Sequence, residues 1–151
     1  MVGGLAGLNC GLIKRGVSGG EVNGGSGGGG GLVGYNDGGR IEHCYSAGLV
    51  SDTKVSTGGL VDRFPSGFVS GSFWDTDASG QSGSAVGSGL STEWMMKADT
   101  FLRAGWDFEE TWSIELSATD GMTVDGNNIA GVAYGALDEE DEKDARAVVP
   151  G

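Results

Sequence analysis

The stretch GLVGYNDGGRIEHCYSAG, which spans Gly31–Gly48, carries the pattern that decides the fold. A Gly-Gly-Leu triplet overlaps its start and ends at Leu32, and the same triplet ends at Leu5 and at Leu60. Other apolar positions keep the same phase: Ile13 with Ile41, Val17 with Tyr45 and Phe73, and Val22 with Val50. This common period predicts an internal repeat in which each copy forms one structural unit.

A period of about 28 residues indicates that each repeat forms one coil of a stacked β-structure. Each coil would hold about three short strands, and apolar residues at matching positions would stack into a continuous core. Glycine suits the corners, where the backbone turns with positive φ. The alternative is a disordered glycine-rich linker, which fits Gly24–Gly31 locally. It does not explain the phased apolar residues, so we favour stacked coils.

Gly31–Gly48 also resembles the GLUG motif, which reads approximately G-L-V-G-x-N-x-G-x-I-x-N-C-Y-S-T-G. His43 stands where the motif usually has Asn, and Ala47 where it usually has Thr. The preceding repeat keeps Gly4–Asn9 but lacks Cys-Tyr-Ser, and the following repeat keeps Gly59–Val61 before it diverges. The resemblance covers about half of the chain. It implies tandem repeats of large secreted or surface-attached bacterial and archaeal proteins, including adhesin-like chains and some surface peptidases.

These observations lead us to expect an all-β fold: a right-handed parallel β-helix or β-solenoid of about three coils of about 28 residues. The coils are assigned to residues 1–77, an aromatic-rich capping segment to 78–114, and a linker or the start of another domain to 115–151. Met122–Val124 is a candidate strand between two turn signals. Asp138–Asp144 holds six acidic residues in seven, which predicts a solvated or disordered acidic tail.

The capping segment is predicted from its aromatic residues, since every tryptophan of the chain follows the third triplet: Trp74, Trp94, Trp106 and Trp112. Large aromatic side chains suit the closing of a solenoid end, which otherwise exposes an apolar cross-section and an unpaired strand edge. Ser91 is a candidate N-cap for a short helix through Met96 or Lys97, and Gly105 is a candidate stop for a helical turn over 100–104. The alternative is that the tryptophans form an exposed glycan-binding platform.

The composition excludes several classes of function. The chain has 151 residues, of which 32 are glycine, and a net charge of −12. This charge disfavours nucleic-acid binding and binding to an anionic membrane surface, both of which need a basic face. It either keeps a glycine-rich protein soluble or reflects adaptation to high salt. No apolar run is long enough to predict a membrane span. The first residues do not resemble a secretory signal, so we expect an export signal upstream.

Three candidate chemical sites stand out, and none predicts catalysis. His43 and Cys44 are neighbours, and neighbours in a strand point to opposite faces, so they should not form a nucleophile pair. Asp75, Asp77 and Ser79 resemble the start of a calcium loop, but Val86 stands where the bidentate Glu belongs. They are a weak calcium candidate. Cys10 and Cys44 occupy different phases of the repeat, so two separate thiols are favoured over a disulfide.

The sequence therefore predicts a module that is not an enzyme and has no resident cofactor, in an extracellular or cell-surface repeat protein. Its expected role is structural or adhesive, with glycans or cell-surface and matrix proteins as candidate partners. The alternatives are a carbohydrate-binding module that uses Trp74, Trp94, Trp106 and Trp112, and a non-catalytic appendage of a surface hydrolase. End-to-end self-association through the edges of the coils is a further alternative.

Overall fold

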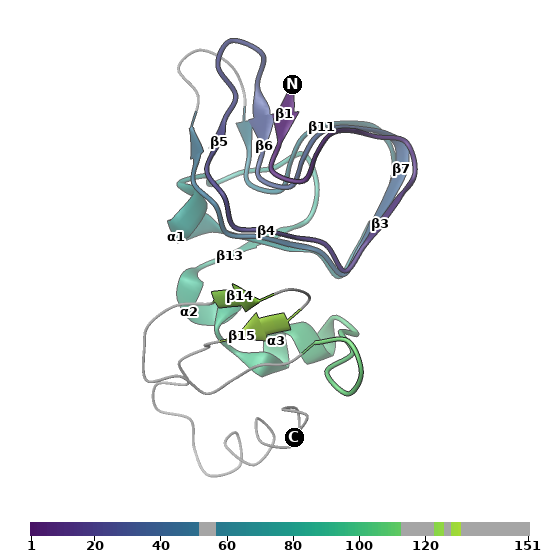
Figure 1. The fold of residues 1–151 in the computed structure, drawn as a ribbon, viewed down its shortest axis with the longest axis vertical. Coiled ribbons are helices and arrows are strands. Elements are labelled where there is room, and N and C mark those ends of the chain that lie inside the picture. Colours follow the sequence, from purple (N-terminus) through teal and green to yellow (C-terminus); the bar gives the residue numbers. More distant parts are fainter. Residues whose placement is uncertain (52–56, 113–122, 126–127, 131–151) are drawn as a thin grey trace. The chain divides into compact units, whose positions relative to one another are not determined.

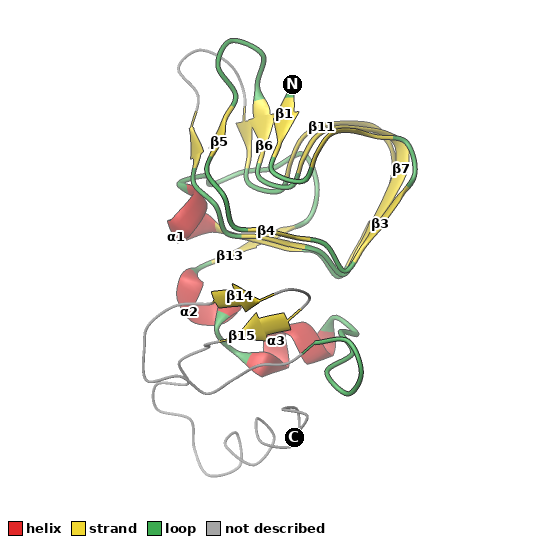
Figure 2. Cartoon of the chain, viewed as in Figure 1, coloured by secondary structure: helices red, strands yellow, loops and turns green. Residues whose placement is uncertain are grey.

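A computed structural model describes residues 1–51, 57–112, 123–125 and 128–130. The chain divides into two compact units, Met1–Thr92 and Glu93–Gly151. Most of the described elements are strands and the few helices are short, as expected for the all-β class (Figures 1 and 2). The acidic stretch Asp138–Asp144 lies outside the described residues, so the prediction of a disordered tail is not tested.

The first unit consists of short strands in regular succession. Their bounds are β1 Val2–Gly3, β2 Ala6–Asn9, β3 Leu12–Lys14, β4 Val17–Ser18, β5 Val22–Asn23, β6 Gly29–Gly30, β7 Val33–Glu42, β8 Tyr45–Ser46, β9 Val50–Ser51, β10 Thr57–Gly58, β11 Val61–Ser70, β12 Phe73–Asp75 and β13 Ser88–Leu90. One short helix, α1 Thr76–Ser79, lies between β12 and β13. Glycines and turns separate the strands, as the sequence predicted.

Every strand pair in this unit is parallel, and the partners come from successive repeats. β6 lies between β1 and β10, and β7 lies between β11 on one side and β2 and β3 on the other. β8 lies between β4 and β12, β13 pairs with β12, and β5 pairs with β9. Leu12 is in register with Arg40, and Arg40 with Phe68, so each residue pairs with the one that occupies its position in the next repeat. Figure 1 shows successive turns of the chain following the same path.

The predicted apolar phase forms the core of this unit. Leu32 and Leu60 are fully buried, and so is Ile41, which pairs in register with Ile13 and Val69. Full burial of each such side chain contributes roughly 1.5–3 kcal/mol. A single turn could not shield its apolar residues, so the stability of the unit depends on stacking.

A polar column lies beside this apolar core. Asn9 Nδ2 donates to Asn36 Oδ1 over 2.6 Å, and Asn36 Nδ2 donates over 3.0 Å to the carbonyl oxygens of Gly39 and Ser66. Both asparagines are buried, so these bonds compensate for the lost hydration of their amides. The column links three successive turns.

The corner after β3, β7 and β11 has the same backbone geometry in each turn. Arg15, His43 and Gly71 occupy the same position in successive repeats and have φ values of 58°, 51° and 52°. Only glycine adopts this left-handed conformation without steric cost, so two of the three turns place an unfavourable residue at the corner. His43 therefore lies at a corner and not within a strand, which is a different reason for its separation from Cys44 than the sequence suggested.

The last turn of the first unit is covered by its own chain. We call residues 81–90 the closing segment. Ser84 Oγ accepts hydrogen bonds from the amides of Leu60 and Val61, and the amide of Gly59 donates to the carbonyl of Gly83. Trp74 is buried, and a Cβ added to either Gly59 or Gly89 would overlap its indole ring. The covering of this end thus depends on one tryptophan and a polar segment.

The second unit contains a small aromatic core. At the boundary between the units lies α2 (Thr92–Met95), followed by α3 (Ala98–Arg103), close to the two helical turns predicted here. The ring centroids of Phe101 and Trp106 are 4.9 Å apart, and those of Trp106 and Trp112 are 4.5 Å apart. Two antiparallel strands follow, β14 (Thr123–Asp125) and β15 (Asn128–Ala130), where the sequence predicted a strand near Met122–Val124.

Candidate binding face

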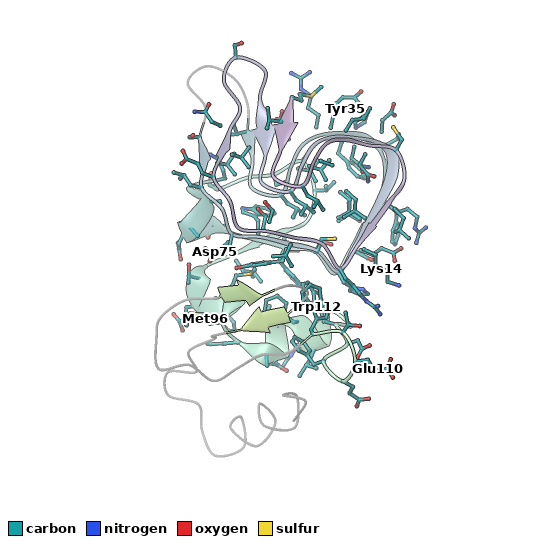
Figure 3. The ribbon with its side chains drawn as sticks, viewed as in Figure 1. Lys14, Tyr35, Asp75, Met96, Glu110 and Trp112 are labelled. Atoms are coloured by element: carbon teal, nitrogen blue, oxygen red, sulfur yellow. The ribbon has the colours of Figure 1, made fainter. Side chains whose placement is uncertain are left out.

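The sheet formed by β2, β3, β7 and β11 exposes a mixed apolar and basic surface, which we call the outer face. It contains two columns in register, Leu8–Tyr35–Arg63 and Leu12–Arg40–Phe68. Leu8, Leu12 and Phe68 are 61%, 59% and 47% exposed, so three large apolar side chains of one sheet are accessible to solvent. In Figure 3, Tyr35 and Lys14 point outward from the ribbon of the first unit.

Cationic side chains gather on the same sheet. The Arg40 guanidinium lies 4.6 Å from the centre of the Phe68 ring and also pairs with Glu42. Lys14 Nζ lies 3.9 Å from the Glu42 carboxylate. The hydrogen bond from Arg40 is the main cause that lowers the pKa of Glu42 below its ordinary value. On the outer face, Arg40 therefore contacts both a carboxylate and an aromatic ring.

The charge of the chain is unevenly distributed. Residues 1–92 hold five Lys and Arg against seven Asp and Glu, a net charge of −2. Residues 93–151 hold four against fourteen, a net charge of −10. The exclusion of anionic partners drawn from the total charge of −12 therefore applies mainly to the second unit. The outer face can approach polar or anionic surfaces without strong long-range repulsion from its own unit.

The four tryptophans do not form one platform. Trp74, Trp106 and Trp112 are buried, at 6%, 3% and 1% exposure, so their rings offer no free face to a sugar. Trp94 is 54% exposed, and Lys97 Nζ lies 4.0 Å from its ring centre. Of the predicted glycan contacts, only Trp94 remains accessible. The sequence could not separate these roles, because a tryptophan suits a core as well as a binding face.

The weak calcium candidate has a structural role. Asp75 is buried and caps α1: its Oδ1 accepts from the amides of Asp77 and Ala78, each at 2.9 Å. The Thr92 hydroxyl donates to the same carboxylate at 2.7 and 2.9 Å. Ser79 is the last residue of α1; it is buried, and its hydroxyl accepts from the amide of Gln81. Across the described ranges no group of three or more His, Cys, Asp or Glu is arranged to hold a metal ion.

The two cysteines are free and lie in different environments. Cys44 is buried, and its sulfur accepts from the amide of Gly16 at 3.3 Å. Burial raises the pKa of the Cys44 thiol to about 11, so it is protonated at neutral pH and is a poor nucleophile. Cys10 is exposed in the first turn. In the structure Cys10 and Cys44 are separate thiols.

Comparison with known proteins gives one relative. No protein family matches the sequence, and no solved structure matches the fold. The chain is 44% identical over 91 residues to a protein of Evansella cellulosilytica named "Putative Gly-rich membrane protein". The match covers 57% of this chain and 10% of that protein, so the chain spans a small part of its relative's length. Among the helices that the structure describes, none is long and apolar enough to cross a membrane.

The outer face does not follow from the repeat period. Its signal in the sequence is the position of Leu8 and Leu12, each of which neighbours an inward-facing residue of the repeat, Asn9 and Ile13. Adjacent strand residues point to opposite faces, so this alternation assigns both leucines to the outside. The period locates the residues that stack, whereas the alternation within one strand locates the residues that are exposed.

Proposed function

We propose that residues 1–92 form a right-handed β-solenoid of three coils and act as a non-catalytic, structural or adhesive module of an extracellular or cell-surface repeat protein. The observation that carries this proposal is the parallel pairing of β-strands between residues at the same position of successive repeats. A stack of this kind holds its outer side chains at fixed spacing and presents an extended surface rather than a pocket.

Two further observations support a surface role. The relative is roughly ten times longer than the matched segment and its name describes a glycine-rich membrane protein, which suits a repeat displayed at a cell boundary. The outer face supplies exposed apolar and guanidinium groups side by side, which is the combination that contacts glycans and protein surfaces through ring faces and hydrogen bonds.

The location is tested with an antibody against this chain. Intact cells that make the native protein should bind the antibody, and a brief protease treatment of those cells should abolish the signal. Labelling only after the cells are permeabilised would contradict a surface location.

The non-catalytic part of the proposal has its own support. Cys44 is buried and protonated, and Asp75 caps a helix, so neither of these two groups is placed to act in catalysis.

The adhesive role is tested with beads coated with the chain. We expect retention on at least one immobilised glycan or matrix protein, and loss of retention when Leu8, Leu12 and Phe68 are all changed to Ser. Leu49→Ser is the matched control, since Leu49 is 48% exposed in the same unit but lies outside the outer face. Equal retention of both variants would exclude the outer face as the adhesive surface.

A carbohydrate-binding module is the second candidate, and it is favoured by the exposed ring of Trp94. Soluble glycans should then quench tryptophan fluorescence, and Trp94→Ala should remove that response while the buried tryptophans continue to emit. Quenching that persists in Trp94→Ala would assign the response to another site.

A further inference from the structure

The same pair of hydrogen bonds joins the first turn to the second and the second turn to the third. The amides of Leu5 and Ala6 both donate to the carbonyl oxygen of Leu32, over 2.9 and 3.2 Å. One turn further on, the amides of Leu32 and Val33 both donate to the carbonyl oxygen of Leu60, over 2.8 and 3.0 Å. The leucine of each Gly-Gly-Leu triplet therefore supplies the acceptor for the turn before it.

In the third turn a side chain takes the place of this carbonyl. The amides of Leu60 and Val61 both donate to Ser84 Oγ, over 3.2 and 2.8 Å, and the Ser84 hydroxyl donates to the carbonyl oxygen of Val61. Leu60 and Val61 are fully buried, so their amides would be costly to leave without an acceptor. One serine hydroxyl thus replaces the leucine carbonyl that a fourth turn would supply.

The closing segment follows the path of a turn but omits one strand. The carbonyl of Gly83 accepts from the amide of Gly59, and Ser88 of β13 is in register with Phe73 of β12. The residue number advances by 15 from Gly58 to Phe73, through β11, but only by 5 from Gly83 to Ser88. Among the described residues, no strand pairs with β11 on its side away from β7. The closing segment therefore continues the sides of β10 and β12 and bypasses the outer sheet.

The third turn also differs from its neighbours at one core position. Trp74 occupies the repeat position of Ser46, where the first turn also has a serine. A Cβ added to Gly31 would overlap Ser46 Oγ, and one added to Gly59 would overlap the indole of Trp74, so each side chain lies against the glycine of its triplet. The Trp74 indole also reaches the closing segment, since its Nε1 donates to the carbonyl of Gln81 over 3.0 Å. The last turn thus has a large side chain where the others have a small one.

We propose that the closing segment is a shortened fourth turn that terminates the repeat array, and that this termination depends on the Ser84 hydroxyl. A further turn would need the amides of Leu60 and Val61, which Ser84 already binds, and the place beside β12, which β13 already fills. These sites are thereby closed to another repeat of the chain and to a strand of another molecule. The inference rests on the stack of coils proposed above and not on its adhesive role.

Hydrogen exchange of individual amides tests the role of Ser84. In Ser84→Ala, the amides of Leu60 and Val61 should exchange roughly tenfold faster than in the unmodified chain, because they lose their acceptor. The equivalent amides of the second turn donate to a backbone carbonyl and should change less than about twofold. Ser84→Thr keeps the hydroxyl and should keep the protection, and Ser82→Ala, at an exposed position of the same segment, is the matched control. Unchanged exchange of Leu60 and Val61 in Ser84→Ala would overturn the role of Ser84.

A chain with one additional turn tests the termination itself, and it keeps the test decisive if Ser84→Ala fails to fold. A second copy of residues 32–59 is inserted between Gly59 and Leu60, so that the same closing segment follows a longer stack. We expect a β-rich spectrum, a larger urea m value because more surface is exposed on unfolding, and protected amides at Leu60 and Val61. A longer chain that loses the β-rich spectrum, or keeps it while these two amides exchange freely, would overturn the terminator. A coil spectrum already in the unmodified chain would overturn the stack itself.

Discussion

Leu5 and Leu60 occupy the same repeat position at opposite ends of the first unit, yet one is 50% exposed and the other fully buried. The difference comes from what lies beyond each turn. Beyond Leu60, the closing segment contributes Ser84, which binds its amide, and Gly87, which lies so close that an added Cβ would overlap the leucine side chain. Among the described residues, no strand pairs with the first turn on its side away from the second turn. Burial in a stacked repeat is thus set by the neighbouring turn and not by the residue's own repeat.

The largest expected effect comes from truncating this leucine at each end. Leu60→Ala should lower the free energy of unfolding by about 2–5 kcal/mol, because it removes a fully buried side chain and leaves a cavity. Leu5→Ala should cost less than about 1 kcal/mol, because half of that side chain is already in water. Urea unfolding followed by circular dichroism measures both, and equal losses would show that the two ends are equally covered.

Two glycines allow the first and second turns to be compared at the level of the backbone. Gly20 and Gly48 occupy the same position in successive repeats, and an added Cβ at Gly48 would overlap the carbonyl oxygen of Gly20, whereas one at Gly20 meets open space. Gly48→Ala should therefore destabilise the unit by about 1–3 kcal/mol, since the two turns must move apart. Gly20→Ala should be within about 0.5 kcal/mol of the unmodified chain. A similar loss in both variants would place a further turn or partner against Gly20.

The repeat and the pairing of its strands could be predicted from the sequence. An apolar residue that recurs once in every repeat is buried most simply when it stacks on its equivalents in the neighbouring repeats. The steps between Leu5, Leu32 and Leu60 match the strand registers, and both helical turns near Ser91 and Gly105 were predicted within a few residues. The repeat is a periodic signal and the helix ends are local signals, so both can be recognised without knowledge of the tertiary contacts.

The closing segment could not be predicted in this way. It is rich in Gly and Ser and covers the last turn through the Ser84 hydroxyl, its own peptide groups and a single apolar contact from Val86, which together leave no periodic hydrophobic pattern. Tryptophan content suggested a single aromatic cap instead. Only Trp74 belongs to the first unit, while Trp106 and Trp112 pack against each other in the second. Residue type alone does not reveal which core an aromatic side chain joins.

The buried thiol of Cys44, in the second turn, should make the free energy of unfolding depend on pH. Burial raises the pKa of Cys44 from an ordinary value of 9.0 to about 11, so the unfolded thiol ionises before the folded one. The contribution of this thiol to the free energy of unfolding is therefore fully present below pH 9 and is lost as the pH rises to about 11. At pH 10 the loss should be about 1 kcal/mol, and Cys44→Ala should remove this part of the dependence. Urea unfolding at pH 8 and pH 10 measures it.

The exposed Cys10 is the internal control for that experiment. A thiol reagent at pH 8 should modify Cys10 at once and Cys44 only as fast as the protein opens, because the Cys44 sulfur is buried and accepts from the Gly16 amide. Rapid modification of both cysteines in the folded chain would contradict the buried position of Cys44 and, with it, the stacking of the first two turns.

The smallest expected effect concerns the corner shared by all three turns. Arg15 and Gly71 have nearly the same left-handed φ, 58° and 52°, but only glycine adopts it without a steric cost from Cβ. Arg15→Gly should therefore raise the free energy of unfolding by about 0.5 kcal/mol, the relief of strain being partly offset by the greater freedom of glycine in the unfolded chain. The reverse substitution, Gly71→Arg, should destabilise, since it imposes the strain at the covered end. If Arg15→Gly destabilises instead, the Arg15 side chain must make a stabilising contact in the first turn that outweighs the strain.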